Sequence, residues 1–153
     1  MKSLKYLVVV ALLGASLAFM RCSSPSGPTT TPQDDLLKKL SGKTWKVQSV
    51  TFDTKTDLTY TNFALTITGT KGSLPFDYST TGRPATSPWP AAGKFTFSAT
   101  DFAQVVIRDD NNLIVNYVVS ATALELNFTY GGTGFAGPRV GNVSGAWEFT
   151  FGL

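Results

Sequence analysis

Residues 124–130 read Leu-Glu-Leu-Asn-Phe-Thr-Tyr, and residues 147–151 read Trp-Glu-Phe-Thr-Phe. Both stretches alternate large apolar residues with polar ones, so every second side chain falls on the same face of an extended chain. This period of two is typical of a β-strand that packs one face on a core and turns the other to water. The two stretches therefore predict neighbouring strands of an antiparallel sheet, with Glu125 and Glu148 on its outer face.

The same alternation recurs through the rest of the chain after Gly42. Further strands are predicted at 45–50, 63–67, 74–78, 95–97, 105–107 and 113–115. Sequential strands usually pair, and closure of a sheet removes its exposed edges. The pattern therefore predicts an all-β fold, an antiparallel up-and-down barrel of about eight strands, with an open sandwich as the alternative. Apolar residues on both faces of 113–119 leave the orientation of that strand open.

A short helix is expected before the first strand. Thr31 can cap it, Pro32 suits its first turn, and Gly42 suits the position after its end. Between the strands predicted at 105–107 and 113–115, the run Asp-Asp-Asn-Asn at 109–112 predicts a hairpin turn. A calcium loop is the less favoured interpretation of this run, because such loops alternate ligands with spacers.

The N-terminal region has the pattern of an export leader. Lys2 and Lys5 precede an apolar stretch at 6–20, which is shorter than the roughly 20 residues of a membrane span but suits a signal peptide. Cys22 follows, and then a Ser/Pro/Thr-rich run without apolar periodicity. We divide the chain into a signal peptide at 1–21, a flexible tether at 22–31 and a folded domain at 32–153.

About the first 32 residues resemble the start of bacterial lipoproteins, in which the cysteine carries the lipid and the protein is anchored to a membrane. We predict Cys22 as the lipid-attachment residue, because the chain's one cysteine lies where acylation requires it. Arg21 departs from the lipoprotein pattern, which has a small residue at that position. The alternative is cleavage after Ala18, which would release a soluble secreted or periplasmic protein with a free thiol.

Composition excludes several kinds of chemistry. The chain has no histidine and one cysteine, so imidazole ligands, histidine-based catalysis and an internal disulfide are all impossible. Removal of the leader takes away Lys2, Lys5 and Arg21, which leaves ten basic residues against ten acidic ones. Such a chain has no basic stripe for nucleic acid. We expect a non-enzymatic protein without a metal or cofactor.

The stretch Leu-Ser-Gly-Lys-Thr-Trp-Lys-Val at 40–47 resembles the opening of lipocalin-like domains, where a helix leads into a Gly…Trp motif. With the runs at 89–97, 108–110, 124–126 and 145–149, the chain is similar to the lipocalin-like lipoproteins of Bacteroidota over residues 36–153. Two residues separate Gly42 from Trp45, where the lipocalin motif has one. The resemblance implies a barrel at the cell envelope, at the outer membrane, and brings no activity with it.

Aromatic and basic residues in the Gly/Pro-rich connections are the candidates for ligand contact. We predict that Trp89 and Phe135 lie at the mouth of the barrel, where Arg83 or Arg139 would orient a small apolar molecule or a glycan. Two more aromatic residues, Phe76 and Tyr78, are assigned to the same rim. The alternative is plain packing of these residues in a filled barrel, which would act through contacts with other envelope proteins.

Overall fold

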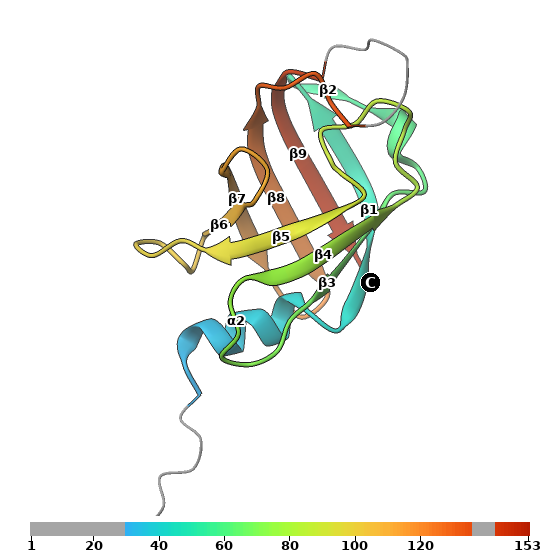
Figure 1. Cartoon of the computed structure of the whole chain (residues 1–153). Coiled ribbons are helices and arrows are strands. Elements are labelled where there is room, and N and C mark those ends of the chain that lie inside the picture. Colours follow the sequence, from blue (N-terminus) through green and yellow to red (C-terminus); the bar gives the residue numbers. More distant parts are fainter. Residues whose placement is uncertain (1–29, 136–142) are drawn as a thin grey trace, which may run out of the picture.

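The computed structural model describes residues 30–135 and 143–153, so the predicted leader and nearly all of the predicted tether lie outside it. One short helix precedes a series of antiparallel strands (Figure 1). The elements are α2 (Pro32–Leu40), β1 (Lys43–Phe52), β2 (Lys55–Thr56), the 3-10 turn η2 (Leu58–Tyr60), β3 (Ala64–Thr68), β4 (Phe76–Thr81), β5 (Ala92–Phe97), β6 (Val105–Arg108), β7 (Leu113–Val119), β8 (Ala123–Tyr130) and β9 (Gly145–Gly152).

The strands close into an up-and-down barrel. From β3 to β9 each strand pairs with the next one in sequence, and β1 pairs with both β3 and β9. Strand β2 only extends β1 by a short hairpin, so eight strands form the wall. The predicted antiparallel barrel with a short N-terminal helix is confirmed, and closure through β1 and β9 decides against an open sandwich.

Strand β1 pairs with β3 on one edge and with β9 on the other, and a bulge interrupts its middle. Its register against β9 shifts between Val47 and Ser49, while its first residues pair with β3. Before the shift an odd-numbered residue, Trp45, is buried, and after it an even-numbered residue, Val50, is buried. The inward-facing positions of the strand therefore change parity at the shift. A bulge bends the strand and strengthens its twist, as barrel closure requires.

Helix α2 covers one end of the barrel (Figure 1). Thr31 forms the predicted N-terminal cap as half of a capping box with Asp34, and Gly42 follows the helix at a positive φ of 76°. Leu37 and Leu40 are buried against the barrel. The Trp45 indole donates a 2.8 Å hydrogen bond to the Leu40 carbonyl, which fixes the helix to β1.

The structure settles the orientation of β7. Val115 and Tyr117 point into the core, whereas Ile114 and Val118 are 61% and 66% exposed. The predicted hairpin turn between β6 and β7 is confirmed by positive φ angles at Asn111 and Asn112, a conformation that asparagine tolerates.

Two sequence predictions near β4 are wrong. Leu74 does not belong to the strand and is 44% exposed, because β4 begins only at Phe76, after Pro75. Phe76 and Tyr78 are not rim residues. They lie at inward positions of β4, at 1% and 2% exposure, and their rings pack on Phe95.

Candidate functional site

The connection between β4 and β5 folds into the barrel instead of leaving its mouth open. It lies at the end of the barrel away from α2 (Figure 1). Trp89 at its inner point is fully buried and meets the rings of Phe128 and Phe149 edge-on, with ring centroids 5.4 and 5.7 Å apart. Edge-to-face contacts of this kind add to the large apolar area that an indole buries. We call residues 87–90, Ser-Pro-Trp-Pro, the plug.

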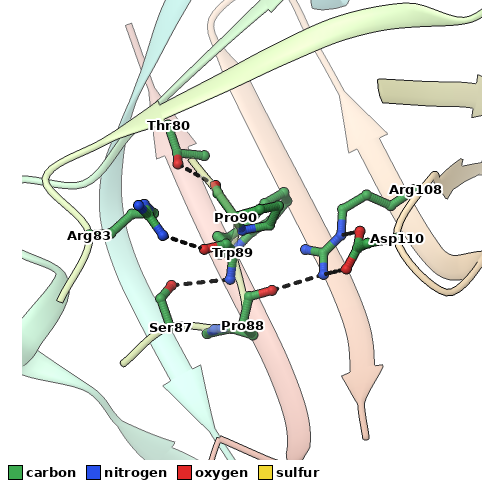
Figure 2. Close-up of polar contacts among 8 residues, drawn as sticks. All are labelled: Thr80, Arg83, Ser87, Pro88, Trp89, Pro90, Arg108 and Asp110. Atoms are coloured by element: carbon green, nitrogen blue, oxygen red, sulfur yellow. Dashed lines mark hydrogen bonds and ion pairs between the residues drawn. The ribbon is translucent and has the colours of Figure 1, made fainter. Parts of the chain in front are cut away.

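Side chains from strand β4, from η2 and from the connection itself hold the backbone of the plug (Figure 2). The Arg83 guanidinium donates a 2.8 Å hydrogen bond to the Trp89 carbonyl, and the Thr80 hydroxyl donates a 2.7 Å bond to the Pro90 carbonyl. The Ser87 hydroxyl accepts from the Trp89 amide and from the Tyr60 hydroxyl. A loop that folds inward has no water to bond its backbone groups. These hydrogen bonds satisfy backbone groups of the plug in place of water and so allow it to be buried.

Arg108 completes this arrangement from strand β6. Its side chain is fully buried, although arginine is rarely so unless paired. The guanidinium donates to both carboxylate oxygens of Asp110 and, at 2.8 Å, to the Pro88 carbonyl of the plug (Figure 2). Its central carbon lies 4.9 Å from the centroid of the Trp89 ring, close enough for a cation–π contact.

Three more rings surround the same guanidinium, at centroid distances of 5.6 to 5.9 Å: Phe128, Tyr130 and Phe135. Such an aromatic cage suits a cation, and here the chain's own arginine occupies it. The interior at this end is therefore filled by the plug, the ion pair and the aromatic core. We call Arg108, Asp110 and Trp89 the Arg108 cluster.

The structure brings three of the predicted ligand residues together, but in a structural setting. Trp89 is closed off from solvent, Arg83 is half-buried and bound to the plug, and Phe135 is half-buried with its amide bonded to the Ser87 carbonyl. Arg139 and Cys22 lie outside the described residues. Whether any of these residues contacts a ligand stays a prediction; in this conformation the indole of Trp89 is not accessible to one.

Arg108 is the residue that sequence reasoning missed. The strand pattern at 105–107 is apolar throughout, so it did not reveal which face was inward. Arg108 lies two residues after Val106 and is buried on the same face, but only the structure shows that this face points inward. Once it does, the buried guanidinium needs a partner, and Asp110 two residues later supplies it.

Burial also sets the behaviour of the interior tyrosines. The pKa values of Tyr60 and Tyr78 are raised well above the ordinary value of 10.0, chiefly because burial disfavours the phenolate. The same cause raises the pKa of Tyr117 to about 12. These phenols stay neutral at physiological pH and supply no general base.

A groove lies on the outside of the barrel and encloses about 880 Å³. It crosses the outer faces of β7, β8 and β9 and reaches the end of β1, where Thr51 lines it. Cross-strand pairing places four of its side chains in one row, each opposite the next: Thr51, Glu148, Asn127 and Asn116. Glu125 and Glu148 thus lie on the outer face of the barrel, as predicted. The Glu125 carboxylate accepts a 2.7 Å hydrogen bond from the Asn127 side-chain amide.

Within residues 30–135 and 143–153, no three or more Cys, Asp or Glu side chains are grouped so that they could hold a metal ion. No helix of the described residues has the length and apolar character needed to cross a bilayer. Neither a protein-family model nor a curated protein nor a solved structure matches this chain.

Proposed function

We propose that this chain is an envelope lipoprotein, anchored through a lipid on Cys22, whose lipocalin-like barrel is a non-enzymatic binding module that works from its outer surface. The module belongs, in this proposal, with the lipocalin-like lipoproteins of Bacteroidota that its motifs resemble. Its ligand class is a small apolar molecule or a glycan. The lipid would hold the barrel at the outer membrane.

The observation that carries this proposal is the filled end of the barrel. A lipocalin-like cup that holds a ligand needs an open mouth and a hollow interior. Here Trp89 and Arg108 are both fully buried at the end away from α2, and Leu37 and Leu40 are buried at the other. An internal ligand would have to displace the plug with its hydrogen bonds, whereas an external ligand displaces only water.

A second candidate function is that of an accessory protein that binds other envelope proteins. It is favoured by four β-branched aliphatic residues that point outward from β6 and β7: Val105, Ile107, Ile114 and Val118. Apolar side chains gathered on an otherwise polar surface are typical of protein contacts. A partner that co-purifies with the wild-type chain and is lost from the Ile114→Lys variant would support this candidate.

Labelling with a fatty-acid analogue tests the proposal of a lipid anchor. The full chain and its Cys22→Ala variant are expressed in a bacterial host supplied with an alkyne-tagged fatty acid. We expect label on the wild-type chain in the membrane fraction and none on the variant. An unlabelled wild-type chain in the soluble fraction, beginning at Phe19, would contradict the anchor and support cleavage after Ala18.

A further inference from the structure

The outer groove has the chemistry of a site for uncharged polar ligands. Seven of its thirteen lining residues are asparagine or threonine, and none is lysine or arginine. Glu148 is its one ionisable residue, and its side chain is exposed. Amides and hydroxyls both donate and accept hydrogen bonds, which matches the alternating donors and acceptors of a polyhydroxylated molecule.

The four-residue row gives the groove a direction. Directly opposed side chains on antiparallel strands have Cβ atoms about 4.5–5.5 Å apart. The row from Thr51 to Asn116 crosses four strands, so it extends about 14 Å at the usual strand spacing. This length suits a chain of several sugar rings better than a single one. Ile114, 61% exposed at the same face, offers an apolar surface for the C–H face of a ring.

Further amides extend the groove beyond this row. Asn111 and Asn112, in the left-handed turn between β6 and β7, also line it and are exposed. No hydrogen bond joins their side chains to another described residue, and the same holds for the Asn116 side chain. Three amides are therefore free to bond a ligand without first breaking contacts within the protein.

The surrounding charge argues against anionic ligands. From residue 98 to the end of the chain, the described part contains one basic residue, Arg108, which is buried and paired with Asp110. Within the groove itself Glu148 is the one charged residue among the lining side chains; exposed Lys55 follows Thr54 at the β1 end, and Asp109 lies beside Lys94 outside the groove. A lone carboxylate in the groove, with no lining cation to pair with an anion, disfavours phosphate, sulfate and uronic acid groups there.

From these features we infer that the groove is a binding site for a neutral oligosaccharide, aligned along the row from Thr51 to Asn116. This inference rests on the proposed function and deepens it, because it selects the glycan over the apolar molecule and locates the site on the outer wall. In this assignment Asn116 and Asn127 bond ring hydroxyls at the centre of the site, and the Glu148 carboxylate accepts from a neighbouring hydroxyl.

An oligosaccharide array tests the inference with the full chain as purified. The array carries neutral linear oligosaccharides of glucose, mannose, galactose, xylose and N-acetylglucosamine, with sulfated and uronic-acid oligosaccharides as charged comparators. Any oligosaccharide that binds is then titrated calorimetrically against the wild-type chain and an Asn116→Ala/Asn127→Ala double variant. The control is Thr96→Ala, an exposed residue on the outer face of β5 away from the groove. Thermal unfolding confirms that all three chains are folded.

We expect binding to at least one neutral series and to none of the charged comparators. The double variant should bind about tenfold more weakly or worse, because two hydrogen-bonding amides are removed, and Thr96→Ala should bind as the wild type does. Affinity should be insensitive to salt, since no charged group of the ligand takes part.

Three results would overturn the inference: no binding to the neutral series, binding unchanged in the double variant, or binding that is confined to charged glycans or falls steeply with salt. A protein partner lost from the double variant, with no glycan bound, would likewise assign the groove to protein contacts. Because the fatty-acid label on Cys22 is read independently, failure of the glycan site and failure of the lipid anchor are distinguishable.

Discussion

Replacement of Asp110 by alanine tests the Arg108 cluster. In the wild type the Arg108 guanidinium is 0% exposed and donates through Nε and Nη2 to Asp110, whose side chain is 18% exposed. Removal of the carboxylate leaves a buried cation with one remaining acceptor, the Pro88 carbonyl at 2.8 Å. Loss of one partner of a buried ion pair costs about 3–5 kcal/mol. Because Asp110 is partly exposed, water can replace it in part, and we expect about 3 kcal/mol.

The measurement is urea unfolding followed by tryptophan fluorescence, with the free energy of unfolding extrapolated to water. The matched control is Asp109→Ala, an exposed neighbour in the same hairpin, which should change stability by less than about 0.5 kcal/mol. An Arg108→Met/Asp110→Ala double variant should be more stable than Asp110→Ala alone, because the unpaired charge is gone and methionine fills the space. A single Asp110→Ala variant as stable as the wild type would refute a buried, paired Arg108.

Three further predictions concern other parts of the barrel. Thr31→Ala removes the cap of α2 and should lower the free energy of unfolding by about 1 kcal/mol in the same urea assay. Gly82→Ala should destabilise strongly and reduce soluble yield, because a Cβ at this position would lie 1.9 Å from the Asn62 carbonyl oxygen at a φ of 64°; the control Gly72→Ala has a similar φ and open space. The pKa of Tyr117, raised from 10.0 to about 12, favours folding while the phenol is neutral, so its contribution is complete below pH 10 and is lost as pH rises through 12. Tyr117→Phe should flatten the fall in stability across that window, and an unchanged slope would contradict it.

The strand pattern was readable in the sequence because burial imposes a period of two on every wall strand. The runs at 124–130 and 147–151 show it most clearly, and all their apolar residues are buried as predicted. Helix α2 was readable for a different reason: Thr31, Pro32 and Gly42 each satisfy a local backbone requirement at its ends. Local rules of this kind act within a few residues and need no knowledge of the fold.

What could not be predicted depends on contacts between distant segments. Trp89 in a Pro-rich connection is equally compatible with an exposed contact and a buried plug, and the choice depends on whether Arg83, Thr80 and Ser87 can satisfy the plug backbone. Arg108 is similar, since the rings around it come from the plug, from β8 and from Phe135, all distant from β6 in sequence. The bulge in β1 was visible in the sequence but overlooked: the apolar residues of this strand change from an odd position, Val47, to an even one, Val50.

The central claim is that the barrel interior is occupied by the chain itself, so that binding takes place outside. Titration of the wild-type chain with the apolar fluorescent probe anilinonaphthalene sulfonate, with native tryptophan emission recorded in parallel, tests this most directly. The filled interior predicts no saturable binding and unchanged emission from the buried Trp45, Trp89 and Trp147. One-to-one saturable binding that quenches this emission, and that is lost or altered in Trp89→Ala, would contradict the claim and return the ligand to the mouth of the barrel.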